Sequence, residues 1–409
     1  PRRLPAMAPM RTKGDVDMDA ERGARDSDAH GHEMTLWGRR AFAKLMGSGL
    51  LLTLGAPLLS GCQGVTDVLD ATLEGKRRIV DDAGREVEIP TAATLERIYF
   101  TSPLAFIYCF TMNPDLLAGT SIPFTPYELE FLPEGMRDLS YMGSLSGNGE
   151  INRESLLLAD VQLVLSISAV ALTEQNKTEA EELQGQTNIP CVCIDGSFQC
   201  VGSCYRMLGD IMGLPDRAEE LAAYCEDVYD RVTQAVSGLT EDRKVSMYYA
   251  EGPDGLQTEP DVSQHALAFY VAGARNVAAV PENEGQGMSN VSLEQVLAWD
   301  PEVIVAWDLK VRGGADQIIR TDPNWSTIRA VRDGRVYTMP NVPFAWCDRP
   351  PGVQRFLGIQ WIANMLYPDL YDVDMVEVAK EFYSTLFWCD ITDDQAKEIL
   401  GNSYPPYRG

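Results

Sequence analysis

The stretch DRAEELAAYCEDVYDRVTQAVSG, residues 216–238, decides the fold of this chain. Its apolar side chains recur at spacings of three and four residues, at Leu221, Tyr224, Cys225, Val228, Val232, Ala235 and Val236. This spacing places them on one face of a helix of about six turns. Pro215 before the stretch and Gly238 at its end match the residues that helices prefer at their two ends. The pattern predicts a long connecting helix over residues 215–240.

Strands alternate with helices on both sides of this predicted helix. Short apolar runs predict a hairpin at residues 79–90 and strands at residues 97–101, 161–166, 191–194, 245–250, 303–307 and 336–339. Strands that alternate with helices form parallel sheets. The sequence therefore predicts an α/β fold of two Rossmann-like lobes with central parallel sheets, an N-terminal lobe over residues 79–214 and a C-terminal lobe with C-terminal helices over residues 241–409.

A repeated motif supports two related lobes. Residues 152–165 and 292–305 both contain a capping residue, a Glu two positions later, one helical turn, an Asp and an apolar strand. Asn152 and Ser292 are favoured N-caps, and Glu154 and Glu294 lie where the helix dipole favours negative charge. Any strand–helix protein can repeat such a unit, but these two copies flank the predicted helix, which favours duplicated lobes.

The first 78 residues predict export and anchoring. Residues 1–33 have almost no large apolar side chains, so we expect them to be disordered and to lie upstream of a true start at Met34. Residues 34–61 contain Arg39-Arg40, a short apolar stretch and Leu59-Ser60-Gly61 before Cys62, which resembles a twin-arginine lipoprotein signal peptide. The interpretation makes Cys62 the acylated residue and residues 62–78 a tether.

Cysteine and charge counts limit the possible functions. Besides Cys62 there are eight cysteines, an even number that outside the cell permits disulfides, with buried thiols as the alternative. The pair Cys200 and Cys204 alone is too little for a zinc site. The chain has 34 Lys and Arg against 60 Asp and Glu, a net charge of −26, which argues against nucleic-acid binding.

Several known catalytic motifs are absent from the sequence. It contains no Gly-x-Ser-x-Gly, no P-loop, no His-Glu-x-x-His and no dinucleotide glycine run. After the predicted signal the only histidine is His265, so a hydrolase would have few candidate catalytic groups. We therefore predict that the chain is not an enzyme and needs no cofactor. An exported α/β hydrolytic enzyme and a surface adhesion or peptide-binding module remain the alternatives from other classes.

Four stretches resemble a known family. They are DDAGREVEIP at residues 81–90, VSLEQVLAWDPEVI at 291–304, DGRVY at 333–337 and FAWCDRPP at 344–351. With the lipoprotein signal and the long helix, they resemble bacterial substrate-binding lipoproteins of ABC importers. The closer resemblance is to the helical-backbone class that binds iron-siderophore, haem and cobalamin complexes.

The resemblance implies more than the residues themselves give. It implies two lobes joined by one long helix, with a ligand cleft between the lobes and little closure. It implies an ABC permease and its ATPase as partners, and docking to the permease through Glu154 and Glu294. It also implies a monomer, held by a lipid anchor at the outer face of the cytoplasmic membrane.

The candidate ligand-binding residues lie at strand ends and in loops, where α/β proteins bind ligands. They are Ser102, Tyr141, Tyr249, Glu251, Trp307, Trp346 and Arg349. Aromatic faces suit a planar or chelated ligand, and Arg349 could pair with a ligand anion or with a structural carboxylate such as Asp348. With one histidine, a bare transition metal is a poor candidate. An iron-siderophore, haem or corrinoid ligand fits better, and a molybdate- or tungstate-type oxyanion is the alternative.

Overall fold

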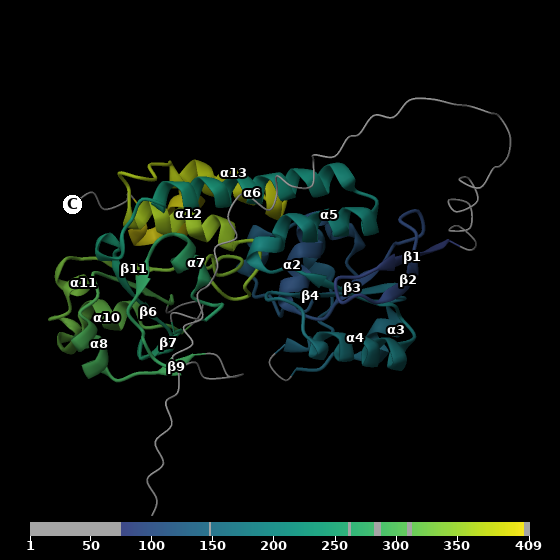
Figure 1. The fold of residues 1–409 in the computed structure, drawn as a ribbon, viewed down its shortest axis with the longest axis horizontal. Helices are drawn as coiled ribbons and strands as arrows, with labels where there is room; N and C mark the ends of the chain where they lie inside the picture. The colour runs from purple at the N-terminus through teal and green to yellow at the C-terminus, as the bar shows by residue number, and fades with distance from the viewer. Residues whose placement is uncertain (1–74, 147–148, 261–262, 282–287, 309–312, 405–409) are drawn as a thin grey trace, which may run out of the picture. The chain divides into compact units, whose positions relative to one another are not determined.

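The computed structural model describes residues 75–146, 149–260, 263–281, 288–308 and 313–404. All of them belong to one compact unit, Cys62–Gly409 (Figure 1). The predictions for residues 1–33, for the signal peptide at 34–61 and for Cys62 lie outside the described residues. Most of the predicted tether, residues 62–78, also lies outside the described residues. Its last three residues belong to the first strand, which begins at Lys76.

The predicted hairpin is present and is docked on the first sheet. Strands β1 (Lys76–Val80) and β2 (Glu86–Pro90) pair antiparallel. In the turn between these strands, the Asp81 carboxylate accepts a hydrogen bond from the Cys193 backbone N–H at 3.0 Å and forms an ion pair with Arg85 at 2.6 Å. Arg85 also donates to the Cys191 backbone oxygen at 2.6 Å. These polar contacts hold the hairpin against strand β5.

The N-terminal lobe is built on a parallel three-stranded sheet in the order β3-β4-β5. Its strands are β3 (Ile98–Phe100), β4 (Leu163–Ser168) and β5 (Cys191–Asp195). Its helices are α2 (Pro103–Met112), α3 (Arg153–Leu158) and α4 (Glu174–Thr187), with short 3-10 turns at Pro114–Leu116, Glu128–Phe131, Glu134–Asp138 and Phe198–Cys200. The strands are almost wholly buried, which explains their continuous apolar runs.

The C-terminal lobe is built on a parallel four-stranded sheet in the order β11-β10-β6-β8. Its strands are β6 (Ser246–Ala250), β8 (Arg275–Asn276), β10 (Val303–Ala306) and β11 (Val336–Thr338), and β7 (Gln257–Thr258) pairs antiparallel with β9 (Ser289–Asn290). Its helices are α7 (Leu267–Val271), α8 (Leu293–Trp299), α10 (Asp316–Thr321) and α11 (Arg329–Arg332), with 3-10 turns at Glu241–Arg243 and Pro323–Trp325. The strand order reverses between β6 and β10, the position at which open parallel sheets bind ligands.

Side chains of the C-terminal sheet alternate between two cores. In β6, Met247 and Tyr249 join the large core that also includes the N-terminal lobe, whereas Tyr248 and Ala250 join a smaller core under α8, α10 and α11. The alternation follows from the two-residue period of a strand. It places the hydroxyl-bearing ring of Tyr249 on the face that also carries the candidate site.

The long predicted helix is α6 (Pro215–Val236), which has 22 residues and therefore spans about 33 Å. Its buried residues are Ala218, Leu221, Ala222, Cys225, Val228 and Val232. It packs along α5 (Val201–Met212) and against α12 (Arg355–Leu366), as Figure 1 shows. Arg206 of α5 bridges Glu219 and Glu226 of α6, both at 2.7 Å.

The C-terminal helices also contact the N-terminal lobe. After α12 come α13 (Met375–Phe387), α14 (Asp393–Leu400) and a 3-10 turn at Gly401–Ser403. Arg217 of α6 donates to the Thr111 and Thr385 backbone oxygens at 2.9 and 2.5 Å, and its guanidinium lies over the Trp388 ring. Trp388 in turn donates to the Phe110 backbone oxygen at 3.1 Å. The joint between the lobes is therefore wider than α6 alone.

The eight cysteines beyond Cys62 are all free thiols, and six of them are buried. The buried-thiol alternative thus holds for these six residues, and the disulfide alternative is wrong for all eight. Burial raises the pKa of the Cys109 and Cys225 thiols well above its usual value, so both are protonated at neutral pH. A protonated buried thiol packs as a small apolar side chain.

Candidate functional site

A cavity of about 810 Å³ is lined by residues of both lobes. From the N-terminal lobe come Thr101 and Ser102 just after β3, Ser166 and Ser168 at the end of β4, and Ser121 from a loop. From the C-terminal lobe come Glu259, Ser263, His265, Phe344 and Arg349. The cavity thus lies at the carboxyl ends of β3 and β4, and its volume is within the range of small-molecule sites.

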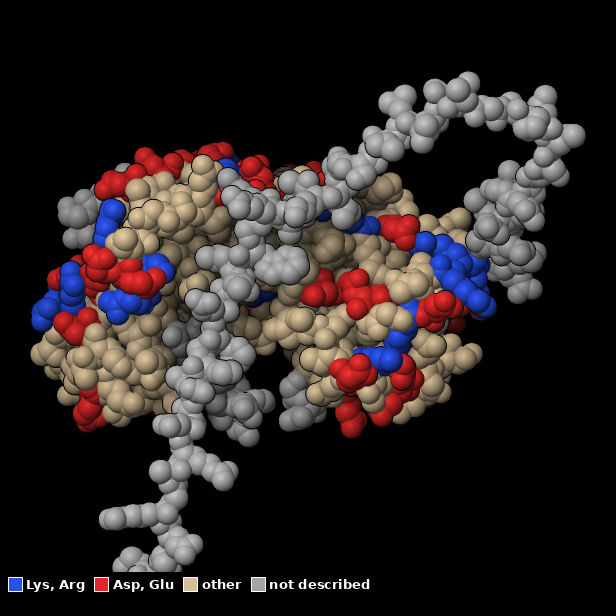
Figure 2. Space-filling view, viewed as in Figure 1, with Lys and Arg blue, Asp and Glu red and all other residues tan. Residues whose placement is uncertain are grey.

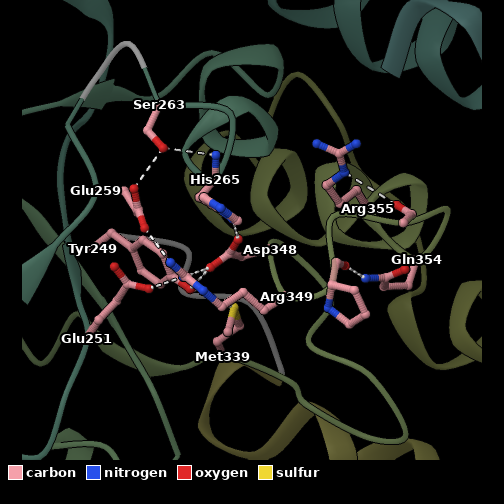
Figure 3. Close-up of polar contacts among 12 residues, drawn as sticks. Tyr249, Glu251, Glu259, Ser263, His265, Met339, Asp348, Arg349, Gln354 and Arg355 are labelled. Carbon is pink, nitrogen blue, oxygen red and sulfur yellow. Dashed lines mark hydrogen bonds and ion pairs between the residues drawn. The ribbon is translucent and has the colours of Figure 1, made fainter. Parts of the chain in front are cut away.

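Arg349 is the centre of a buried charge cluster on the C-terminal side of the cavity (Figure 3). Its guanidinium contacts the carboxyl groups of Glu251 at 2.6 Å, of Glu259 and of its neighbour Asp348. The three carboxylate side chains are at most 1% exposed, whereas that of Arg349 is 21% exposed. The guanidinium is therefore positioned by carboxylates of the protein while part of it still faces the cavity.

Hydrogen bonds extend this cluster in two directions. The Tyr249 hydroxyl donates to Asp348 at 3.2 Å, and the Trp307 indole N–H donates to that hydroxyl at 2.8 Å. On the cavity side, His265 Nδ1 bonds to the other oxygen of Asp348. Ser263 links the remaining parts, since its hydroxyl donates to Glu259 at 2.7 Å and accepts from the His265 backbone N–H at 3.1 Å. Each of these groups thus fixes the orientation of another.

Burial dominates the electrostatics of Glu251. It raises the pKa of this carboxyl to about 9; the charge of Asp348 adds to the rise and Arg349 opposes it. Glu251 is therefore protonated at neutral pH and bonds to Arg349 as a neutral acid. Burial acts to lower the pKa of Arg349, but the neighbouring carboxylates outweigh it and raise that pKa above its usual value. Arg349 remains a cation throughout the physiological range.

Four of the seven candidate ligand residues come together in this cluster: Tyr249, Glu251, Trp307 and Arg349. Of these four residues only Arg349 lines the cavity. The side chains of the other three are buried and do not line it. Ser102 lines the other wall, where its hydroxyl accepts from the Ala105 backbone N–H at 3.1 Å as the N-cap of α2.

The structure does not bring the other two candidates to the cavity. Trp346 is fully buried in the core, and its indole N–H donates to the Tyr383 hydroxyl of α13 at 3.4 Å. Tyr141 is 56% exposed and pairs through its backbone with Thr120. Neither side chain lines the cavity. The sequence pattern placed both near a strand end or loop but carried no signal for the direction of the side chain.

Sequence reasoning also left out Glu259 and Ser263, and it considered His265 only as a catalytic group. Glu259 follows β7, a strand of two residues that is too short to give a periodic pattern. His265 lies in a turn just before α7. Its nearness to Asp348 depends on the tertiary fold, so the local sequence gave no signal for it.

The two predicted docking residues are exposed. Glu154 lies in the first turn of α3, which Asn152 caps by accepting from the Ser155 backbone N–H at 3.0 Å. Glu294 lies in the first turn of α8, where hydrogen bonds from its own backbone N–H and from Ser292 lower the pKa of its carboxyl. Both are available as negative charges at helix starts, and their docking role stays a prediction.

Charge is mixed over the face of the molecule shown in Figure 2, where acidic side chains recur with smaller basic groups between them. Among the described ranges, no group of three or more His, Cys, Asp and Glu side chains is arranged to hold a metal ion. No helix in those ranges is long and apolar enough to cross a membrane.

The fold and the cavity define a two-lobe α/β binding protein, and comparison with known proteins identifies its family. A family model described as periplasmic binding protein matches residues 132–343. The chain belongs to this family. A solved ABC transporter solute-binding protein from Sulfurospirillum deleyianum matches with a TM-score of 0.71 and 28% identity, over 79% of this chain and 98% of that one.

Two curated relatives give a similar result. The molybdate-binding protein MolA of Haemophilus influenzae is 34% identical over 159 residues, which is 39% of this chain and 43% of that protein. This chain therefore spans less than half of the length of MolA. An uncharacterised ABC transporter substrate-binding lipoprotein of Bacillus subtilis, YvrC, is 20% identical over 341 residues, 80% of this chain and 99% of that protein.

These comparisons confirm the predicted class, a substrate-binding protein of an ABC transporter, and with it the predicted α/β fold of two lobes. The relatives are binding proteins rather than enzymes, which confirms that prediction as well. Export agrees with membership of a periplasmic family. The ligand, the anchor, the domain boundaries and the site residues stay predictions.

Proposed function

We propose that this protein captures a metal chelate of the siderophore, haem or corrinoid type outside the cell and delivers it to an ABC permease. The cavity volume of about 810 Å³ is the observation that carries the proposal. A ligand of several hundred Å³ would fill such a space and touch both lobes. A tetrahedral oxyanion would occupy only a small part of it.

The chemistry of the walls supports a large ligand with mixed polarity. Pro343, Phe344, Pro350 and Pro351 provide apolar surface beside the polar side chains. Arg349 is already paired with three carboxyl groups of the protein, so its charge is in large part compensated before any ligand arrives. A ligand that carries its own chelating groups needs no free cation of the protein.

Molybdate or tungstate is the second candidate, and the relationship to MolA favours it. That protein is named for molybdate binding and is 34% identical over the aligned residues. Its solved molybdate-bound structure shares the fold at a TM-score of 0.62 and 23% identity, which speaks for the fold alone. An oxyanion would bind at one wall of the cavity, where hydroxyl groups could hold it.

Delivery would use the features outside the cavity. In this proposal acylated Cys62 holds the monomer at the outer face of the cytoplasmic membrane. The exposed carboxylates of Glu154 and Glu294, one on each lobe, dock on basic sites of the permease. The permease and its ATPase then import the ligand.

A thermal-shift panel of ferrichrome, ferrioxamine B, haem, cobalamin, molybdate and tungstate tests the proposal. A ligand that binds the native state raises its melting temperature in proportion to saturation. We expect at least one chelate to raise it strongly and the two oxyanions to have little effect. A shift with molybdate and tungstate alone would replace the first candidate with the second, and no shift with any probe would contradict both.

A further inference from the structure

The wall that the N-terminal lobe gives to the cavity is rich in hydroxyl groups. Six hydroxyl side chains line it: Thr101, Ser102, Ser121, Ser146, Ser166 and Ser168. Among the described residues of this lobe, the charged side chains in the lining are Glu128 and Glu179, and no Lys or Arg is among them. This wall therefore offers hydrogen bonds rather than positive side-chain charge.

Neighbouring backbone segments bring these hydroxyls to one end of the sheet. The Thr101 backbone N–H donates to the Leu165 oxygen at 3.1 Å, and the Thr101 hydroxyl donates to Ser166 at 3.2 Å. Leu117 pairs in parallel with Ile98 of β3, and Thr120 then pairs in parallel with Tyr141. Ser121 and Ser102, the N-cap of α2, both line this wall, and the ring of Phe124 packs 5.6 Å from that of Phe106 in α2.

Ser121 differs from its neighbours in having no hydrogen-bond partner. Its hydroxyl is buried, the residue is 3% exposed, and that oxygen has no hydrogen-bond partner among the described groups. The hydroxyls of Thr101 and Ser102, in contrast, are both bonded within the protein. A buried hydroxyl without a partner is unfavourable. An acceptor on a ligand in the cavity would remove that cost.

The N-terminus of α2 adds positive potential to this wall of the cavity. The helix has 10 residues and begins at Pro103, next to Ser102 in the cavity lining. The backbone N–H groups of Ala105 and Phe106 are bonded to Ser102, and among the described residues the Leu104 N–H has no acceptor. The partial positive charge of a helix start favours negatively charged oxygens.

We propose that Ser121 and the start of α2 form a subsite for a negatively charged oxygen of the ligand. Such an oxygen belongs to a metal-bound hydroxamate or catecholate, a carboxylate, or an oxo group of an oxyanion. The subsite rests on the proposed function, since the ligand must occupy this cavity. It recognises that oxygen with hydrogen-bond donors, while Arg349 stays paired with its carboxylates.

The test compares Ser121→Ala with the wild type and with Ser203→Ala. Ser203 is an exposed residue of α5 whose hydroxyl bonds to a backbone oxygen of its own turn, so it serves as the matched control. Titration calorimetry with ferrichrome, ferrioxamine B and molybdate measures the affinity. For each probe that binds the wild type, we expect Ser121→Ala to weaken binding about tenfold or more and Ser203→Ala to leave it unchanged. A response with the two ferric hydroxamates assigns a metal-bound chelate oxygen, and a response with molybdate assigns an oxo group.

The ligand-free protein gives a second readout. Because the Ser121 hydroxyl has no partner within the described protein, Ser121→Ala should keep or slightly raise the melting temperature. A fall of several degrees would mean that Ser121 serves the fold and would overturn the subsite. If Ser121→Ala leaves the affinity for the probes unchanged, the subsite is overturned and the proposed function stands. No binding of any probe would overturn both.

Discussion

Replacing Arg349 with Met removes the cation from the cluster of buried carboxyl groups around it. Met keeps an unbranched apolar side chain, so the change isolates the charge. The Asp348, Glu251 and Glu259 side chains, at most 1% exposed, would lose the guanidinium that all three contact. Glu251 is already neutral at pH 7, because its pKa is about 9. The penalty therefore falls on Asp348 and Glu259.

Breaking a buried ion pair from one side costs about 3–5 kcal/mol, because the remaining charge stays buried without compensation. We expect Arg349→Met to lower the free energy of unfolding at pH 7 by an amount in that range. The loss should shrink as the pH is lowered toward 5, since carboxyls without a cation take up protons more readily in the folded variant. Urea unfolding followed by tryptophan fluorescence at both pH values measures this.

Arg231→Met is the matched control. Arg231 forms a single ion pair with Asp227 at 2.7 Å, and its side chain is 47% exposed. Exposed pairs of this kind contribute about 0–1 kcal/mol. If Arg349→Met cost no more than Arg231→Met, or if its cost did not change with pH, the carboxylate cluster would not depend on Arg349 and the reasoning would be refuted.

Three further predictions concern stability, docking and anchoring. Glu251→Gln should flatten the pH dependence of the free energy of unfolding. Between pH 4.5 and about 9 the wild type takes up a proton on folding, so its stability falls as pH rises, by up to about 1.4 kcal/mol per pH unit. Equal slopes of stability against pH for the variant and the wild type in urea unfolding would contradict this. Glu154→Ala with Glu294→Ala should abolish uptake of a labelled ligand while its measured affinity stays the same; normal uptake would remove both residues from the docking surface. Cys62→Ala should move the protein from the membrane fraction to the soluble fraction, and a variant still pelleting with membranes would count against an acyl anchor.

The fold was largely predictable because its signals are local. The stripe in residues 216–238 has the helical period, and the observed α6 (Pro215–Val236) follows it closely. The apolar runs gave strands within two residues of β4, β5, β6 and β10, since strands buried on both faces must be continuously apolar. The two-residue strands β7, β8 and β9 were missed, because pairing rather than composition creates them.

The site was less predictable because it depends on side-chain direction and on distant contacts. Arg349 and Glu251 were both chosen from the sequence, but not as partners, although their side chains lie 2.6 Å apart. Trp346 lies three residues from Arg349, yet its side chain enters the core. In a segment without regular structure, no period relates sequence position to side-chain direction. The sequence therefore could not show that Arg349 faces the cavity while Trp346 enters the core.

The contacts around α6 bear on how the two lobes can move. A rotation about this helix alone would have to break the hydrogen bond from Arg217 to the Thr385 oxygen and that from Trp388 to the Phe110 oxygen. It would also separate the stacked rings of Phe198 in the N-terminal lobe and Phe356 on α12, which lie 4.5 Å apart and nearly parallel. A hinge of two or three extended strands has no such contacts to lose. We therefore expect a ligand to fit this cavity by side-chain adjustment on two nearly fixed walls, with the permease sensing occupancy through small changes in the spacing between Glu154 and Glu294.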